Sequence, residues 1–238
     1  LEPENLRDLQ AAVVEHGADL GLAFDGDADR CFVIDELGAP VSPSAITALV
    51  ARREIARAKA AGEATPVIIH NLITSRAVPE LVEADGGRAV RTRVGHSFIK
   101  ALMAAEGAVF GGEHSAHYYF RDFWFADTGM LAAMHLLAAL GEQERPLSEF
   151  AAAYERYVAS GEINSTVADQ QAKLAEVRAA YPDATCDELD GLTLHFADGA
   201  WANLRPSNTE PLLRLNVEAP TADRMTSLRD EVLALVRR

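Results

Sequence analysis

The sequence predicts an α/β protein in which a mixed-sheet α/β domain is followed by a smaller α+β domain. Over the first two thirds of the chain, short apolar runs alternate with segments of helical period, which is typical of a parallel or mixed sheet covered by helices. After about Tyr157 the predicted strands cluster together instead, and a long helix follows them. The length of 238 residues allows this division, because each part is long enough to bury a core of its own.

The first two thirds of the chain contain most of the predicted helices. A helix-like segment begins near Pro3 and ends at Gly17, a residue type that commonly terminates helices. Apolar residues at helical spacing predict a second helix over 44–60, with Ser44 as its N-cap. The other expected helices cover 75–87, 96–107 and 129–143, and the expected strands cover 18–24, 31–35, 66–72, 88–94, 108–112 and 117–120. The residues expected in the core include Cys31, Met103, Met130 and Met134.

The last third has the pattern of a sheet with a helix at its end. Asp198-Gly199 lies between two alternating segments, and this dipeptide is a strong indication of a hairpin. A helix is expected over 221–238, because Thr221 suits its N-cap and the terminal arginines suit its C-terminal end. The expected strands cover 161–167, 191–196, 200–205 and 212–219.

Composition and charge exclude several classes of function. The 22 basic and 36 acidic residues give a formal net charge of -14, which argues against proteins that bind nucleic acid or anionic membranes through a basic face. No apolar run approaches the roughly 18 residues of a membrane helix. The two cysteines are too few for a disulfide framework, so we expect a cytoplasmic protein. Because the chain begins at Leu1 within a helix-forming segment, we also expect it to be part of a longer polypeptide.

The clearest chemical signal is an acidic loop, Asp25-Gly26-Asp27-Ala28-Asp29-Arg30, after the first predicted strand. Alternate residues of an extended chain point the same way, so a tight turn here brings three carboxylates together. Their charges repel one another unless a cation or a proton compensates, and oxygen ligands favour Mg²⁺ or Ca²⁺ over zinc. A solvated acidic turn is the alternative. An EF-hand is excluded, because Arg30 stands where that loop needs glycine.

A second loop, residues 111–118, combines two glycines with polar side chains. The glycines allow the backbone to approach a ligand, and Glu113, Ser115 and His117 offer hydrogen-bonding groups for hydroxyls. A strand end with ordinary surface polar residues is the alternative. Zinc binding by His114 and His117 is not favoured, since no third ligand is evident.

A third loop, residues 205–211, connects two predicted strands. Its hydroxyl and amide side chains and its backbone N–H groups suit a phosphate, and Arg205 adds a guanidinium that can donate two parallel hydrogen bonds. Arg214 on the next strand is placed to assist, and a simple turn bounded by prolines is the alternative. Elsewhere, His96 stands where a strand passes into a helix, as either a site residue or a helix cap.

The three loops, in this order, resemble those of the α-D-phosphohexomutase family, most closely its phosphomannomutase/phosphoglucomutase branch. GLAFDGDADR is similar to the family's magnesium loop, GGEHSAHYYF to its sugar-specificity loop and RPSNTEP to its phosphate-binding loop, and RVGHSFIK matches a further segment. The resemblance covers the whole chain and implies a phosphohexomutase-type fold. In that fold, residues 1–41 would be the tail of a second α/β domain and would carry the metal loop. Residues 42–155 would form a third α/β domain with the sugar loop. Residues 156–238 would form a C-terminal α+β domain, which has a four-stranded sheet and binds phosphate.

The resemblance also implies a reaction. A phosphoserine donates its phosphoryl group to a hexose 1- or 6-phosphate, and the resulting hexose 1,6-bisphosphate turns over and returns the other phosphoryl group. The implied residues of the metal centre are Asp25, Asp27 and Asp29 for Mg²⁺, Arg30 beside it, and His96 for proton transfer. The implied ligands of the sugar phosphate are Glu113, Ser115 and His117 for the hydroxyls, and Arg205, Ser207, Asn208, Thr209 and Arg214 for the phosphate that does not react.

The chain departs from the family pattern at several points. A Ser-His-Asn-Pro type serine loop does not occur in the sequence, so we expect the chain alone to bind substrate without turnover and to need N-terminal domains of the same polypeptide. Ala116 stands where many members have glycine, and Leu72 where some have lysine. The alternatives are phosphoglucosamine mutase, whose phosphate loop usually reads Ser-Gly-Thr, a non-catalytic sugar-phosphate-binding protein, and a Mg²⁺-dependent phosphatase. The oligomeric state is left open.

Overall fold

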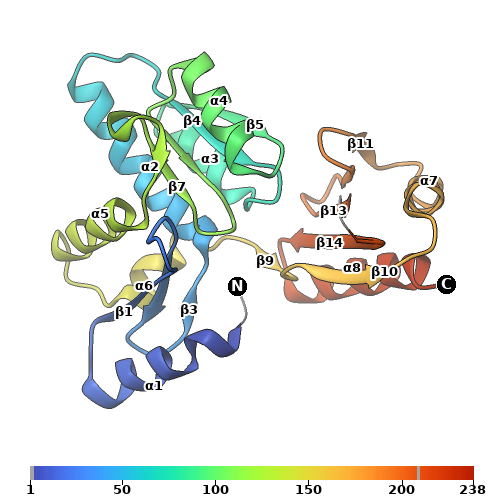
Figure 1. Cartoon of the computed structure of the whole chain (residues 1–238), viewed down its shortest axis with the longest axis horizontal. Helices are drawn as coiled ribbons and strands as arrows, with labels where there is room; N and C mark the ends of the chain where they lie inside the picture. Colours follow the sequence, from blue (N-terminus) through green and yellow to red (C-terminus); the bar gives the residue numbers. More distant parts are fainter. Residues whose placement is uncertain (1–2, 208–209) are drawn as a thin grey trace. The chain divides into compact units, whose positions relative to one another are not determined.

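The computed structural model describes residues 3–207 and 210–238, and the chain forms two compact units, Leu1–Arg156 and Tyr157–Arg238. Among the described residues, the first unit holds a three-stranded and a five-stranded sheet, and the second unit holds a six-stranded sheet (Figure 1). The predicted α/β class with a change to clustered strands in the last third is therefore confirmed.

The three-stranded sheet is antiparallel and consists of β1 (Leu20–Phe24), β2 (Cys31–Asp35) and β3 (Pro40–Val41). A 3-10 turn, η1 (Pro3–Leu6), leads into helix α1 (Arg7–His16), which packs against β1 and β2. All five residues of β2 are buried, because the sheet is covered on both faces at this strand. The turn between β1 and β2 is the acidic loop.

The five-stranded sheet has the order β5-β4-β6-β7-β8 and is mixed, as predicted. Strand β4 runs parallel to both of its neighbours, β5 and β6, whereas β7 runs antiparallel to both of its neighbours, β6 and β8. Its strands are β4 (Val67–Asn71), β5 (Arg88–Thr92), β6 (Phe110–Gly112), β7 (Tyr118–Phe120) and β8 (Ala126–Asp127). Its helices are α2 (Pro43–Ala60), α3 (Ala77–Ala84), α4 (His96–Glu106), the 3-10 turn η2 (Arg121–Phe123), α5 (Gly129–Gly141) and α6 (Leu147–Ala152).

Two sequence predictions about this unit are wrong in detail. Ser42, not Ser44, caps α2: its side chain accepts the N–H of Ser44, because Pro43 lacks an N–H and occupies the first helical position. Met103 is buried against Ile69 and Ile99, as predicted. Met130 and Met134 of α5, by contrast, are 52% and 58% exposed, because they lie on the outward side of their helix.

The second unit is an antiparallel sheet in which β10-β14-β13-β12-β11 form a continuous path and β9 pairs with β14. Its sheet exceeds the expected four strands, because β9 and β11 add two- and three-residue edge strands. The strands are β9 (Val158–Ala159), β10 (Ile163–Thr166), β11 (Thr185–Asp187), β12 (Leu192–His195), β13 (Trp201–Pro206) and β14 (Leu212–Ala219). The helices are α7 (Gln170–Ala180), which the sequence analysis missed, and α8 (Ala222–Val236), which Thr221 caps as predicted.

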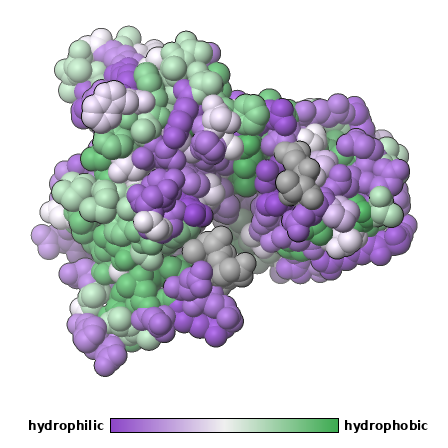
Figure 2. Space-filling view, in the orientation of Figure 1, coloured by the Kyte–Doolittle hydropathy of each residue, from purple (hydrophilic) through white to green (hydrophobic). Residues whose placement is uncertain are grey.

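The surface of the first unit is apolar over part of its area. Figure 2 shows apolar surface where Figure 1 has α5 and β1. The exposed apolar side chains of α5 are Met130, Leu131, Met134 and Leu137. Among the described residues, no helix combines the length and the apolar character needed to cross a membrane.

Gly129, the first residue of α5, lies in close backbone contact with the acidic loop. Its N–H donates to the Ala28 carbonyl at 3.0 Å, and a Cβ at this position would lie 2.4 Å from the Arg30 carbonyl oxygen. Gly129→Ala therefore forces backbone atoms apart, and we expect it to lower the free energy of unfolding by about 1–3 kcal/mol. Urea denaturation of the chain, followed by circular dichroism, measures this loss.

The control lies at the other end of the same helix. A Cβ at Gly141 meets no heavy atom within 4 Å, so Gly141→Ala should leave stability unchanged or raise it by up to about 1 kcal/mol. Equal stability of the two variants would contradict the close contact between α5 and the acidic loop.

Candidate functional site

The acidic loop turns sharply between two antiparallel strands. Phe24 and Cys31 are paired, so the loop consists of the six residues between them. The N–H of Ala28 donates to the Asp25 carbonyl at 3.1 Å, and Ala28 takes a positive φ of 59°. This turn brings one oxygen from each of Asp25, Asp27 and Asp29 within 4.8 Å of one another. The convergence of carboxylates expected from the sequence is present.

Arg30 balances part of the negative charge of the loop. Its backbone N–H donates to Asp25 Oδ1 at 3.1 Å, and its guanidinium Nε donates to Asp25 Oδ2. Burial acts to raise the pKa of Asp25, but these hydrogen bonds outweigh it and the pKa is lowered. Asp29 behaves in the opposite way: burial, and then the neighbouring Asp25 carboxylate, raise its pKa.

One carboxylate oxygen of Asp29 has no hydrogen-bond donor among the described residues. Its Oδ1 is buried and accepts no hydrogen bond from the residues that the structure describes. A buried carboxylate oxygen is costly in that state, and a bound cation would relieve the cost. The donor set consists of oxygens, which are the ligands that Mg²⁺ prefers. These residues therefore fit a magnesium ion.

The sugar-loop candidates form a second tight turn between β6 and β7. The N–H of Glu113 donates to the His117 carbonyl at 3.0 Å, and the N–H of Ala116 donates to the Glu113 carbonyl at 3.1 Å. Ser115 Oγ lies 3.0 Å from His117 Nδ1. Ala116 adopts a positive φ of 68°, a region that favours glycine, so alanine is strained here by roughly 1 kcal/mol.

Glu113 lies at the centre of a buried hydrogen-bond network. Its side chain is buried, and Oε1 accepts from the Tyr119 hydroxyl at 2.6 Å. Its Oε2 accepts from Asn71 Nδ2 at 3.1 Å and from the Gly95 N–H at 3.4 Å. The carboxylate therefore joins the end of β4, strand β7 and the start of α4. No local motif marks Asn71 in the sequence; it joins the site because the parallel strands β4 and β6 end at the same sheet edge.

The metal-loop and sugar-loop candidates are in direct contact. Arg30 and His117 form an isolated antiparallel bridge, and the N–H of Cys31 donates to the Ala116 carbonyl at 3.2 Å. His117 Nε2 lies 3.6 Å from Asp29 Oδ1. Cys31 itself is buried, as predicted, and burial raises the pKa of its thiol to about 12. The two loops thus form one polar site within the first unit.

His96 is the first residue of α4 and is exposed. The reading of His96 as a helix cap is wrong: Gly95 occupies the N-cap, and no side chain caps this helix. One turn along α4, Lys100 Nζ lies 2.6 Å from Asp127 Oδ1 of β8. Neither of these two charged residues is marked by a sequence motif, because their contact joins elements that are distant along the chain.

The phosphate-loop candidates belong to the second unit. Arg205 of β13 is the cross-strand partner of Arg214 of β14, and both guanidinium groups contact Glu162, at 3.3 and 3.0 Å. The Nε of Arg205 is buried and donates to no described residue. The N–H of Ser207 donates to the Leu212 carbonyl at 2.8 Å. Asn208 and Thr209 lie outside the described residues. Two cations thus share one carboxylate, which leaves positive charge available for an anion.

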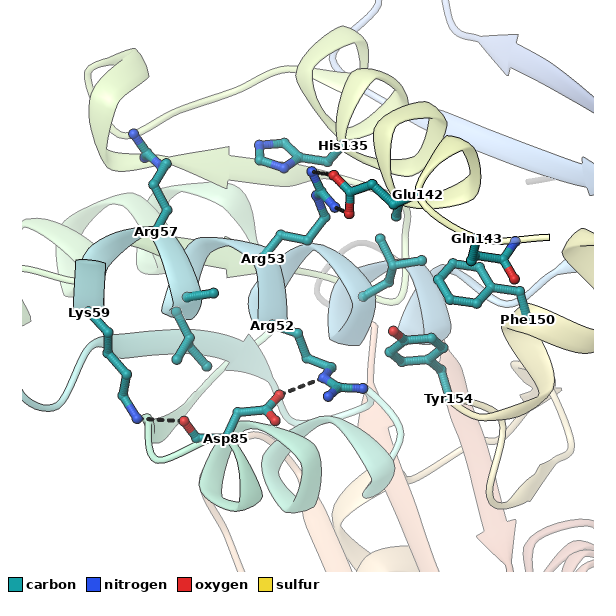
Figure 3. Close-up of a pocket in the computed structure, with 14 residues that line it drawn as sticks. Arg52, Arg53, Arg57, Lys59, Asp85, His135, Glu142, Gln143, Phe150 and Tyr154 are labelled. Atoms are coloured by element: carbon teal, nitrogen blue, oxygen red, sulfur yellow. Dashed lines mark hydrogen bonds and ion pairs between the residues drawn. The ribbon is translucent and has the colours of Figure 1, made fainter. Parts of the chain in front are cut away.

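A separate groove of about 860 Å³ in the first unit is a weaker candidate (Figure 3). It is lined by residues of α2, α5 and α6, and none of the three loops contributes to it. Figure 3 shows Arg52 directed at Asp85 and Arg53 at Glu142, and the guanidinium of Arg53 makes two hydrogen bonds to that carboxylate. Its arginines are therefore engaged by carboxylates of the same chain.

Comparison with known proteins identifies the family. The chain matches the descriptions "Phosphoglucomutase/phosphomannomutase, alpha/beta/alpha domain II" over residues 1–38, "domain III" over 42–157 and "C-terminal domain" over 162–235. It is 39% identical over 236 residues to a phosphomannomutase of Methanocaldococcus jannaschii, covering 99% of this chain and 51% of that protein. The chain thus spans about half the length of such relatives.

Solved structures agree with this result. A phosphoglucomutase/phosphomannomutase family protein of Burkholderia thailandensis superposes with a TM-score of 0.85 at 28% identity, covering 99% of this chain and 50% of that one. An N-acetylphosphoglucosamine mutase of Aspergillus fumigatus, in complex with GlcNAc-6P and magnesium, has a TM-score of 0.68 at 18% identity, covering 91% of this chain and 48% of that one. The three loops, the fold and the matches along the chain lead to one conclusion: the chain belongs to the phosphoglucomutase/phosphomannomutase family.

Proposed function

We propose that this chain supplies the metal-, sugar- and phosphate-binding parts of a phosphohexomutase that interconverts hexose 1-phosphate and hexose 6-phosphate through a hexose 1,6-bisphosphate. The observation that supports this most directly is the bridge between Arg30 and His117, which joins a carboxylate loop suited to Mg²⁺ to a loop suited to sugar hydroxyls. In the family plan, 1–41 belong to the second domain, 42–155 form the third and 156–238 the fourth.

Each loop has a distinct part in this proposal. Bound Mg²⁺ would offset charge on the transferring phosphoryl group. Arg30 holds Asp25 and directs a guanidinium at the same centre. Glu113, Ser115 and His117 are the proposed ligands of the sugar hydroxyls. The buried carboxylate of Glu113 also fixes the loop through its hydrogen bonds to Asn71 and Tyr119. His96, exposed at the start of α4, is the candidate for proton transfer at the attacking hydroxyl.

The second unit would hold the phosphate that does not react. Arg205 and Arg214 donate charge-assisted hydrogen bonds to its oxygens. Ser207, Asn208 and Thr209 add hydroxyl, amide and backbone donors. A fixed phosphate site of this kind suits a substrate that binds in two orientations, because either phosphate of the bisphosphate can occupy it while the other one reacts.

We do not propose that the chain itself supplies the phosphoryl donor. No Ser-His-Asn-Pro segment occurs in the sequence, and we propose that the phosphoserine is supplied by N-terminal domains of the same polypeptide. The chain alone should bind sugar phosphate without turnover. Adding an N-terminal half that carries the phosphoserine should yield hexose 6-phosphate from mannose 1-phosphate or glucose 1-phosphate with Mg²⁺ and a trace of hexose 1,6-bisphosphate.

The same assay separates the alternative functions. Preference for glucosamine 1-phosphate would indicate a phosphoglucosamine mutase, and release of free phosphate would indicate a phosphatase. Binding of sugar phosphate without turnover by the extended protein would indicate a non-catalytic binding protein.

Asp27→Asn tests the metal loop. Removal of one of three converging carboxylates should weaken Mg²⁺ binding by this chain by about tenfold or more, because affinity depends on the charge of the ligands. The turnover of the extended enzyme should fall by orders of magnitude. Because Asp27 is exposed, the thermal unfolding midpoint should change little.

Isothermal titration with Mg²⁺ measures the affinity, and Asp183→Asn, at another exposed aspartate, is the control. Unchanged Mg²⁺ affinity and turnover in Asp27→Asn would remove the metal assignment.

Arg205→Ala tests the phosphate loop. A charge-assisted hydrogen bond contributes about 1.5–3 kcal/mol, so binding of glucose 1-phosphate should weaken by roughly ten- to a hundredfold. The control is Arg224→Ala in the same unit, where the guanidinium pairs with Asp198 instead. Equal affinities of the two variants, measured by titration calorimetry, would rule out a phosphate-binding role for Arg205.

A further inference from the structure

Lys100 makes a contact that the roles proposed so far do not use. It lies four residues after His96 on α4, so the two side chains share one face of the helix. Its Nζ is 2.6 Å from Asp127 Oδ1, and the side chain of Asp127 is 10% exposed. A mostly buried carboxylate thus has its charge balanced by an ammonium group from another element.

Asp127 also faces the metal and sugar loops. Single ligand atoms of Asp127, Asp29 and His117 lie within 4.8 Å of one another. Two carboxylates and an imidazole form a donor set of the kind that zinc and related transition metals bind well. The acidic loop, by contrast, offers oxygens alone. Asp29 belongs to both groups, so a metal held by His117 and Asp127 would engage a carboxylate of the acidic loop and a side chain of the sugar loop.

We propose that Lys100 is a positioning residue that keeps transition metals out of this site. Its ammonium pairs with Asp127 and offsets the negative charge that would attract a metal ion to the set of Asp127, Asp29 and His117. Asp29 then stays available to the acidic loop, and His117 to the sugar. The benefit of keeping Asp29 and His117 free of metal rests on the proposed function, because that function needs both residues. The ion pair of Lys100 with Asp127 and the cluster of Asp29, His117 and Asp127 are structural observations that do not depend on it.

A purely structural role for Lys100 predicts a different result. Its Nζ lies 5.7 Å from the centre of the Tyr119 ring, and Tyr119 donates to Glu113. If Lys100 served only to pack on that ring, its loss would loosen the sugar loop, whatever residue stood at position 127. Exclusion of metal, in contrast, acts through the Asp127 carboxylate and disappears when that carboxylate is removed.

The test is Zn²⁺ affinity of the 238-residue chain, measured by competition with a chromophoric chelator. Lys100→Met should raise the affinity by about tenfold or more, because the freed carboxylate completes the set with Asp29 and His117. Lys100→Met combined with Asp127→Asn should return it to the starting value. Lys100→Arg keeps the cation and should match the unaltered chain.

Two further variants complete the design. Lys59→Met removes a lysine whose Nζ donates to the Asp85 carbonyl elsewhere in the unit, so it controls for the change in net charge. His117→Gln in the Lys100→Met background should abolish the gain in Zn²⁺ affinity. Circular dichroism verifies that each variant is folded.

The inference is overturned if Lys100→Met leaves the Zn²⁺ affinity unchanged, if the gain persists in the double variant with Asp127→Asn, or if Lys59→Met gives an equal gain. Mg²⁺ titration of the unaltered chain and of Asp27→Asn reports separately on the acidic loop. A chain that fails to bind Mg²⁺ but shows the full Zn²⁺ pattern would contradict the proposed function and leave the role of Lys100 intact.

Discussion

Repulsion between carboxylates is the constraint on which the site depends. The tight turn between β1 and β2 places three aspartate oxygens close together, and the fold then has to compensate their charge. Arg30 does so at Asp25, and Lys100 does so at Asp127 a short distance away. Asp29 retains a buried oxygen with no donor from the described chain, so the compensation is incomplete at the one position that both ligand groups share. This local excess of negative charge is the physical basis of the proposed cation site.

Sheet topology explains how residues far apart in sequence reach this place. Strands β4 and β6 are parallel and adjacent, so Asn71 and Glu113, which come at or after their ends, meet at one edge. Helix α4 begins at the same edge, where the Gly95 N–H joins the network and His96 and Lys100 follow on one helical face. The polar groups are thereby attached to rigid elements, and the buried Glu113 ties these elements to one another.

Much of the fold could be predicted from the sequence, because apolar periodicity and turn residues mark most elements. Helix α7 was missed because Val177 is its single fully buried residue among polar neighbours, so that its apolar stripe is weak, although Asp169 before it is a good N-cap. The loops could be found because each is a local motif. Two contacts could not be predicted from the sequence, that of Lys100 with Asp127 and that of Asn71 with Glu113. Each joins residues that are close in the fold but far apart along the chain, so no sequence spacing indicates it.

The bridge between Arg30 and His117 has a consequence for how the family's sequences can change. Backbone hydrogen bonds join the acidic loop to the sugar loop, and the left-handed residues Ala28 and Ala116 stand on either side of this contact. Gly129 closes the same arrangement with its N–H on Ala28. A substitution that alters the backbone of one loop therefore shifts the other. We therefore expect substitutions at positions 113–118 to require compensating changes at positions 28–31, so that under the proposed function the sugar loop and the metal loop would change together.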